Sequence, residues 1–520
     1  MRSSDYLRSG LAIVLGLALL VPVSLAGVGA SGARIAVAAS ASRTLIVAQP
    51  AEPQTLDYLA GTVKSENNIF NHITEGLVQI DEGMNVVPAL AQSWQVQSDR
   101  VTWRFKLRRS VKFHNGEPFD ASAAKFNIDR GIHNPPPGVV SSMAQLIKID
   151  HTTVVDPFTI DVVTKEPIPP AVFLVNFVAY QMAPPRAYAG KAIGETGRNP
   201  IGTGAYKFGE WVSGDHITLK ANDEYWGGAP SIKTIEFRFL PELSTRLAEL
   251  QTGGVNIIAG VPPDKIASIN KTATARVVAI SGGRRIMVGI NFKTNPALRD
   301  KRVRQALNYA FNFDALNRGL FAGLAKRTGN IVNPPWGDAN LKPYPYDPAK
   351  AKALLQQAGY GAGLNLVLDA PNGKYIRDKE IVQALAADLQ KIGIKTEVRV
   401  FEWSIYNDRL HRYKVDDLFL TGSGSNFEGQ SDIIDYQKDL DYNYGFYNNP
   451  QFETMWTQLN ATLESDKRTA LLHKMERSLY DDPPVVYVYM QPDIYGISKN
   501  VSWQPRKDEI IDLRKAKFID

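Results

Sequence analysis

The feature that most constrains the fold is a helical pattern that ends at glycine and leads directly into a strand pattern. Residues 378–391 have the apolar spacing of an amphipathic helix, Gly393 follows as its stop, and IKTEVRV at 394–400 alternates as a strand. The segment 347–359 repeats the helical part, because it opens with Asp-Pro and closes with glycine. Helix feeding strand in this way predicts an α/β protein rather than an all-α or all-β one.

A strand and a sharp turn are predicted over residues 101–116. In VTWRFKLRR at 101–109, apolar and polar residues alternate, as in a strand with one buried face. The Asn-Gly pair that follows His114 tolerates positive φ and predicts a turn, and Asp120 can then cap a helix. A catalytic histidine is the alternative. We favour a turn histidine, because no Ser, Cys or second His stands nearby at a useful spacing.

Length and composition describe an ordinary globular protein. A chain of 520 residues exceeds one hydrophobic core and predicts two or three domains. Its 44% hydrophobic and 22% charged residues exclude a disordered chain and a multi-span membrane protein. The net charge of +6 is small, and its basic residues are scattered among nearly as many acids. We expect no nucleic-acid partner, since such binding uses a clustered basic stripe.

The N-terminus has the pattern of an export signal. Two arginines precede and flank an apolar run at residues 11–26, and small residues follow it. Ala36-Val37-Ala38 fits the cleavage pattern best, with Ser24-Leu25-Ala26 as an earlier option, so a cleaved signal peptide of residues 1–39 is predicted. An uncleaved anchor is the alternative, which the proline inside the apolar run disfavours.

Cysteine is absent from the whole sequence. The chain therefore has no disulfide framework despite the export signal, and no cysteine that could carry a lipid. Both properties fit a freely diffusing periplasmic protein that is not a lipoprotein.

The sequence offers no pattern typical of an enzyme or a metalloprotein. The seven histidines show no ligand-like spacing, and no phosphate-binding glycine motif is present. The segment TGSGSNFEG at 421–429 lacks the glycine that a serine-hydrolase elbow needs, so it reads as a Gly/Ser loop after a strand. We expect no catalytic residue, no metal and no cofactor.

Several long segments resemble the extracellular solute-binding proteins of family 5, the peptide- and nickel-type receptors of ABC importers. They include LAQSWQVQSDRVTWRFKLRRSVKFHNGEPFDASAAKF at 90–126, the segments 201–240 and 290–316, and YPYDPAKAKALLQQAGY at 344–360. They occur in the family's order from about Thr44 to the C-terminus. The resemblance implies a periplasmic receptor that captures a small solute and delivers it to permease and ATPase subunits. A secreted hydrolase and a chemotaxis receptor are the alternatives, and we expect a monomer.

The resemblance also implies an α/β fold of the type II periplasmic-binding-protein class. In that fold two lobes flank a central cleft, and an extra subdomain is grafted onto the first lobe. Carried onto this chain, lobe I takes residues 40–73, 200–285 and 487–520, the extra subdomain takes 74–199, and lobe II takes 286–486. The apolar segments 284–292 and 483–491 suit the two strands that cross between the lobes, about which such a receptor closes.

The ligand prediction depends on one departure from the peptide receptors of this family. They hold the ligand's ammonium with an aspartate in the loop after a lobe II strand, and the residue here that aligns best is Ser423. A hydroxyl cannot supply the charge-assisted bond of a carboxylate. Ordinary peptides with a free amino group are therefore disfavoured, and opine-like or sugar-like solutes are favoured, unless Glu428 swings into the same space.

The resemblance places the other ligand-binding candidates in the same cleft. For several an alternative role is open: the tryptophans can be core residues, the two cations solvated charges, and the asparagines caps or turns. The predicted ligand-binding residues are Ser423, Ser425, Asn426, Glu428, Trp403, Lys374, Arg377, Asn68, Asn71 and Trp336.

Overall fold

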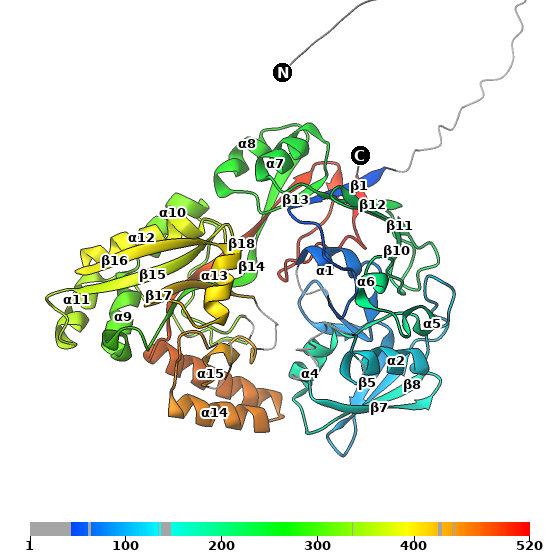
Figure 1. The fold of residues 1–520 in the computed structure, drawn as a ribbon, viewed down its shortest axis with the longest axis horizontal. Helices are drawn as coiled ribbons and strands as arrows, with labels where there is room; N and C mark the ends of the chain where they lie inside the picture. The colour runs from blue at the N-terminus through cyan, green and yellow to red at the C-terminus, as the bar shows by residue number, and fades with distance from the viewer. Residues whose placement is uncertain are drawn as a thin grey trace, which may run out of the picture. The chain divides into compact units, whose positions relative to one another are not determined.

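The fold was analysed in a computed structural model. It describes residues 43–519 except 61–63, 134, 137–146, 335, 425–428, 439 and 441–442. The predicted export signal therefore lies outside the described residues. The predicted α/β class is confirmed, because one large mixed sheet is covered by helices (Figure 1).

The large sheet passes through two central strands that pair with each other along most of their length. Its strand order is β10 (Tyr206–Val212), β11 (His216–Ala221), β12 (Thr234–Phe239), β1 (Thr44–Gln49), β13 (Ile257–Ala259), β18 (Val485–Ser498), β14 (Ala275–Ile290), β17 (Leu418–Ser423), β15 (Leu364–Asn372) and β16 (Ile394–Glu402). The two strands predicted at 284–292 and 483–491 are confirmed as parts of β14 and β18, which are both longer than expected.

The register between β14 and β18 shifts at the middle of the sheet. Ile280 pairs with Asp493 before the irregularity, and Arg285 pairs with Met490 after it. On one side β18 pairs with β13, and on the other β14 pairs with β17. The two strands thus join two half-sheets through a glycine-containing irregularity, where the regular ladder is interrupted.

A second, four-stranded antiparallel sheet forms from the early part of the chain. Its order is β5 (Ala91–Val96), β6 (Thr102–Leu107), β8 (Thr159–Thr164) and β7 (Ile149–Asp156). Trp103 is buried and stacks on Phe173, with ring centroids 4.1 Å apart. The strand predicted at 101–108 is confirmed, including its buried apolar face. Two-stranded pairs complete the described strands: β2 (Glu75–Gly76) with β9 (Gln181–Met182), β3 (Val78–Ile80) with β4 (Val86–Pro88), and β19 (Val501–Ser502) with β20 (Lys517–Phe518).

The helices follow local start and stop signals. Those before the central strand β14 are α1 (Lys64–Phe70), α2 (Ala121–Ile132), α4 (Pro170–Phe177), α5 (Pro185–Tyr188), α6 (Ile193–Thr196), α7 (Leu243–Thr252) and α8 (Ile266–Asn270). Those after it are α9 (Lys301–Ala310), α10 (Phe313–Phe321), α11 (Pro348–Gln357), α12 (Asp378–Lys391), α13 (Trp403–His411), α14 (Pro450–Ala461) and α15 (Ser465–Asp481). Three short 3₁₀ turns are η1 (Pro263–Lys265), η2 (Pro296–Arg299) and η3 (Ile434–Tyr436).

Two predicted caps are confirmed atom by atom. The Asp120 carboxylate accepts hydrogen bonds from the backbone N–H groups of Ser122 and Ala123 at the start of α2. Asp347 accepts from the Lys350 N–H at the start of α11, and Pro348 occupies the first turn. Each cap satisfies an N–H group that the helix itself leaves without a partner.

His114 is a structural residue, as predicted. The turn after it is confirmed by Gly116, whose φ is +86°. Its ring Nε2 lies 2.9 Å from the carbonyl oxygen of Gly204, and its backbone N–H donates to the carbonyl of Gly202. Burial lowers the pKa of His114 to about 4, so the ring is neutral at neutral pH. The histidine holds the turn against the loop 202–204.

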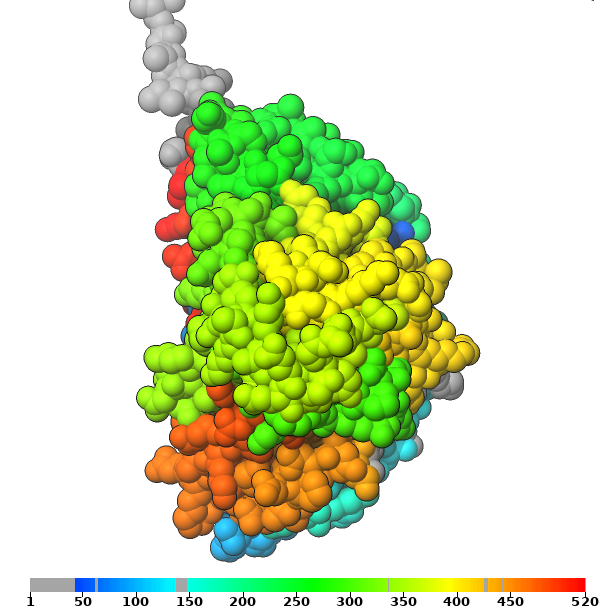
Figure 2. Space-filling view, turned by 90° about the vertical axis from the view of Figure 1, so that its left-hand side faces the viewer, coloured from blue at the N-terminus to red at the C-terminus, as the bar shows by residue number. Residues whose placement is uncertain are grey.

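Alternation along β14 separates two environments. Ile286, Val288 and Ile290 point into a core shared with α9 to α12, whereas Met287 belongs to a different cluster with α14 and α15. In the side view of Figure 2, the segment from α11 to β16 covers the middle of the face, with α14 and α15, in orange, below it. The face of β14 that carries Met287 is the one on which the candidate site lies.

Candidate ligand-binding site

The floor of a cavity is made by paired residues of two neighbouring strands. In the antiparallel register Arg285 is opposite Ser423, Met287 opposite Thr421 and Gly289 opposite Phe419. Because side chains alternate along a strand, these pairs share one face of the sheet. At the last pair, a Cβ on Gly289 would lie 2.2 Å from Cζ of Phe419. Glycine is therefore needed there, since any side chain would collide with the ring.

One wall comes from α13. This helix starts directly after β16, and the Glu402 carboxylate caps it by accepting from the Ser404 N–H at 2.8 Å. Trp403, Asn407 and His411 are four residues apart along the helix, so they lie on the same face and line the cavity. Nδ1 of His411 lies 2.8 Å from the carbonyl oxygen of Asn407.

The opposite wall is an aromatic loop that follows η3. Asn443 fixes this loop, because its amide donates to the Tyr447 carbonyl at 2.7 Å and accepts from the Tyr447 N–H at 2.9 Å. The Tyr436 hydroxyl donates to Sδ of Met287 at 3.7 Å, which ties the loop to the floor. The asparagine is thus fully used in holding the wall and is not free to bind a solute.

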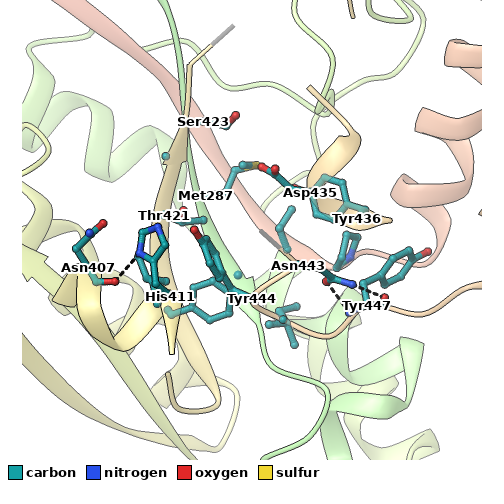
Figure 3. A pocket seen from close by; sticks show the side chains of 18 of the residues that line it. Met287, Asn407, His411, Thr421, Ser423, Asp435, Tyr436, Asn443, Tyr444 and Tyr447 are labelled. Carbon is teal, nitrogen blue, oxygen red and sulfur yellow. Dashed lines mark hydrogen bonds between the residues drawn. The ribbon is translucent and has the colours of Figure 1, made fainter. Parts of the chain in front are cut away.

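The cavity enclosed by these elements has a volume of about 370 Å³. That lies within the usual range of small-molecule sites, about 300–1,000 Å³. Figure 3 shows side chains from the sheet, α13 and the aromatic loop around a common space. The lining residues are Arg284, Met287, Gly289, Ile290, Phe292, Lys374, Tyr375, Trp403, Asn407, Leu410, His411, Phe419, Thr421, Gly422, Ser423, Gly424, Asp435, Tyr436, Asn443, Tyr444, Gly445, Tyr447, Pro484 and Val485.

Two cations line the cavity, and they differ in their partners. Arg284 is engaged, because its guanidinium donates to both carboxylate oxygens of Glu509 at 2.9 and 3.0 Å. The Lys374 ammonium lies 4.2 Å from the ring centroid of Trp403 and makes no ion pair or hydrogen bond with any described residue. Partial burial lowers the pKa of Lys374, and the nearby Arg284 lowers it further. Lys374 is therefore the cation available to an anionic solute.

The loop before the aromatic wall carries two carboxylates. Asp432 is buried in an ion pair with Arg285 at 3.0 Å, with both side chains 1% exposed. Asp435 lines the cavity and is only partly buried. Burial raises the pKa of Asp435 to about 7, Arg285 opposes the shift, and Asp432 adds to it.

The structure brings three of the ten predicted ligand-binding residues together. Ser423, Trp403 and Lys374 line the cavity, from β17, α13 and the loop before α12. Three others, Ser425, Asn426 and Glu428, lie outside the described residues. The role of each in ligand binding stays a prediction.

The remaining four lie away from this cavity. Arg377 pairs with Asp264 at 2.6 Å and with Glu380 at 3.1 Å. Asn68 is buried, and its side-chain oxygen accepts from the Ile511 N–H at 2.9 Å. The Asn71 oxygen accepts from Nε2 of Gln181 at 2.6 Å. Trp336 packs against a core cluster with α14 and α15, and its carbonyl oxygen lies 3.2 Å from Nε2 of His473.

Sequence reasoning missed several lining residues, above all Asp435 and the face of α13. Asn407 and His411 follow Trp403 at a spacing of four, which is a signal the sequence does carry. Asp435 had no such signal, because three acidic residues follow Ser423 and only the tertiary structure shows that Asp432 is taken by Arg285.

The geometry can now be set beside known proteins. Residues 85–443 match the family model described as "Bacterial extracellular solute-binding proteins, family 5 Middle". The chain belongs to this family. Among curated relatives, the glutathione-binding proteins GsiB of Salmonella choleraesuis and Salmonella typhi are 28% identical over 492 residues, covering 92% of this chain and 95% of theirs.

Solved structures with the same fold cover 92% of this chain. The substrate-binding protein CtaP of Listeria monocytogenes gives a TM-score of 0.84 at 20% identity, and all of that chain is covered. NikA of Brucella suis, in complex with Fe(III)-EDTA, gives 0.80 at 23% with all of that chain covered. The periplasmic binding protein DppA of Helicobacter pylori, in complex with the peptide STSA, gives 0.76 at 24%, and 98% of that chain is covered.

These likenesses confirm the predicted type II periplasmic-binding-protein fold and the solute-binding function. The family and the curated relatives are binding proteins rather than enzymes. Across the part of the chain that the structure describes, no helix is long and apolar enough to cross a membrane. Within the same residues, no three His, Cys, Asp or Glu side chains gather as a metal site.

Proposed function

We propose that this protein is the periplasmic receptor of an ABC importer for a small, peptide-like solute that carries a carboxylate. Family membership supports the class of function. The curated relatives are named for binding glutathione, and one solved neighbour holds a tetrapeptide. A cavity of about 370 Å³ lined by aromatic and polar side chains suits a solute of that kind.

The observation that carries the carboxylate is the ammonium group of Lys374. It lines the cavity, has a tryptophan ring on one side, and has no anionic partner among the described residues. A solute carboxylate at this place would form a charge-assisted hydrogen bond, which is stronger than one between neutral groups. Arg284 beside it adds positive potential, although its own donors are held by Glu509.

Capture would involve closure of the two half-sheets about the central strands. We assign lobe I to residues 40–73, 200–285 and 487–520, its extra subdomain to 74–199, and lobe II to 286–486. The irregular pairing of β14 and β18 supports a hinge there, since only two strands connect the half-sheets at that point. The Arg284–Glu509 pair joins a residue at the start of lobe II to one from lobe I beside the cavity.

An exported, soluble form is part of the proposal. The apolar segment 11–26 with small residues after it supports cleavage near Ala39, and the absence of cysteine supports a receptor without a lipid anchor. The partners would be the permease and ATPase subunits of the importer, and the receptor would act as a monomer.

The experiment is native mass spectrometry of protein purified from its own cells, followed by calorimetric titration of ligand-free protein. The probes are the dipeptide Met-Leu, glutathione, their amidated forms and a neutral disaccharide. We expect the free acids to bind at least about tenfold more tightly than the amides, because the amides lose the bond to Lys374. Tight binding of the disaccharide with no binding of any acid would overturn the proposed solute class.

A further inference from the structure

The loop from Asp432 to Tyr436 holds two carboxylates in opposite situations. Asp432 is saturated: it pairs with Arg285 and also accepts from the Asn333 N–H at 2.8 Å. Asp435 lines the cavity and makes no hydrogen bond or ion pair with any described residue. A buried or partly buried carboxylate normally has such partners, because leaving it without them costs free energy.

The surroundings of Asp435 do not compensate for this lack of partners. The charged and titratable groups that face it are Arg285 from β14, Asp432 from its own loop, and the hydroxyls of Tyr436 and Tyr447. Arg285 donates to Asp432, Tyr436 donates to Met287, and the Tyr447 hydroxyl accepts from Asn449 at 3.0 Å. None of these groups is spent on Asp435.

Burial therefore decides the protonation state of the empty site. It raises the pKa of Asp435 to about 7, so that near neutral pH a large fraction of the molecules hold a proton on this carboxyl group. A cation placed against the carboxylate would reverse the shift, because opposite charges at close range favour the ionised form.

We propose that Asp435 receives a cationic group of the solute, and that capture releases the Asp435 proton to the solvent. The O–H bond of the carboxyl group breaks, water or buffer takes the proton, and the solute's N–H group donates to the carboxylate oxygen. The inference rests on the proposed function, since it adds a cationic pole to a solute whose carboxylate goes to Lys374. The solute class is then a zwitterion, such as a peptide or an amino-acid conjugate with a free amino group.

This inference revises what Ser423 alone suggests. The serine cannot hold an ammonium group, but a carboxylate twelve residues later lines the same cavity. Ser423 and Asp435 come from β17 and η3, on two different sides of the space drawn in Figure 3. Binding would then be tight at neutral pH and weak in acid, where the proton competes with the solute.

The test titrates wild type and Asp435→Asn with Met-Leu and with N-acetyl-Met-Leu at pH 5.5, 7 and 8. For wild type we expect Met-Leu to bind about 30-fold more tightly at pH 8 than at pH 5.5, from a carboxyl group that titrates near 7. The acetylated probe should show no such gain. In the variant the pH dependence should disappear, and at pH 8 Met-Leu should bind about 10- to 100-fold more weakly than to wild type.

Two controls keep the outcome specific. Asp408→Asn removes an exposed carboxylate from α13 that pairs with Arg412, and it should leave both probes unaffected. His411 also lines the cavity and titrates, so pH dependence that persists in Asp435→Asn would assign the effect elsewhere and overturn the inference. Equal binding of Met-Leu and its acetylated form by wild type would overturn it as well.

A ligand-free measurement separates this inference from the proposed function. The Asp435 carboxyl signal, assigned by its loss in Asp435→Asn, is followed by carbon-13 NMR with ethylammonium chloride, and with sodium chloride as control. A lowered pKa only with ethylammonium supports the cation site even if no peptide binds, in which case the proposed function fails alone. An unchanged pKa, together with tight peptide binding by both proteins, leaves the proposed function standing and removes the inference.

Discussion

Asp57 and Asp435 are two carboxylates in different parts of the fold, and their surroundings are opposite. Asp57 is fully buried, receives two hydrogen bonds from Arg130 and one from the Leu59 N–H, and also accepts from the Thr196 hydroxyl. Asp435 faces a cavity and receives none from the described residues. The first joins three segments that are distant in the sequence. The second joins nothing within the protein, which is what a group held ready for a solute requires.

The comparison teaches that the satisfaction of a polar group is more informative than its burial. Both carboxylates are acidic groups in poorly solvated places, but only the saturated one contributes to architecture. The same contrast holds between Arg284, which Glu509 engages, and Lys374, which faces only a tryptophan ring. Variants at satisfied groups should change stability, and variants at unsatisfied cavity groups should change binding.

The largest effect is expected at the saturated pair. Arg130→Met keeps the apolar stem between Tyr58 and Tyr188 but leaves the Asp57 carboxylate buried and unpaired. We expect the free energy of unfolding to fall by about 3–5 kcal/mol, the usual consequence of removing one partner of a buried pair. The measurement is urea unfolding followed by circular dichroism.

The matched control for this variant is Arg104→Met, which breaks an ion pair of similar length to Asp161. Arg104 is 38% exposed, so its loss should cost about 0–1 kcal/mol. A cost for Arg130→Met no greater than that of Arg104→Met would show that saturation does not mark architecture here.

Asp493 is an intermediate case that can break the comparison. It lies in β18 beside the irregularity, its Oδ2 atom has no partner, and it does not line the cavity. Burial raises the pKa of Asp493 to about 8, and Glu509 adds to the shift. The folded state therefore favours the neutral acid. Its contribution to stability is complete below pH 4 and is lost as the pH rises toward 8.

Asp493→Asn should remove this pH dependence, because asparagine stays neutral. Relative to wild type, we expect the variant to gain about 3 kcal/mol in the free energy of unfolding between pH 5 and pH 7, at about 1.4 kcal/mol per pH unit. Asp435 and Glu476 titrate in the same direction in both proteins, so the difference isolates Asp493. Parallel pH profiles for the two proteins would contradict the expectation.

The third effect concerns binding rather than stability. Lys374→Met keeps the apolar contact with Trp403 but removes the charge, so Met-Leu should bind about tenfold more weakly, with little change in the urea midpoint. Lys374→Arg, which keeps the charge, should retain most of the affinity. If both variants bound like wild type, the carboxylate would have to sit elsewhere in the cavity.

Local signals in the sequence predicted much of the fold. Asp120 and Asp347 cap their helices because an aspartate before an apolar helical pattern is sufficient for that role within a few residues. Gly359 and Gly393 both have φ of +89°, where glycine is favoured, and they end their helices as predicted. The helix 378–391 and the strand after it are confirmed for the same reason.

The cavity could be predicted only in part, because its residues come together through pairing between distant strands. Trp403 and Lys374 were named from the family resemblance, and they lie together. The availability of Asp435 depends on Arg285 choosing Asp432, a choice made in three dimensions. Arg377 shows the converse, since its proximity to Lys374 in sequence suggested a similar role.

The smallest effect is expected at Arg377. Its φ is +62°, an uncommon value for a residue with a side chain, and its guanidinium bridges Asp264 and Glu380 while being 35% exposed. Arg377→Gln loses the bridge but keeps the backbone strain, so stability should fall by about 0–1 kcal/mol. Arg377→Gly loses the same bridge but relieves the strain by roughly 1 kcal/mol, so it should be no less stable than the glutamine variant. Urea midpoints of the two variants give the comparison, and titration with Met-Leu supplies the second measurement. Because Arg377 lies outside the cavity, both variants should bind within about twofold of wild type. A tenfold loss in Arg377→Gln, equal to that in Lys374→Met, would instead mean that Arg377 exchanges Asp264 for the solute carboxylate on capture.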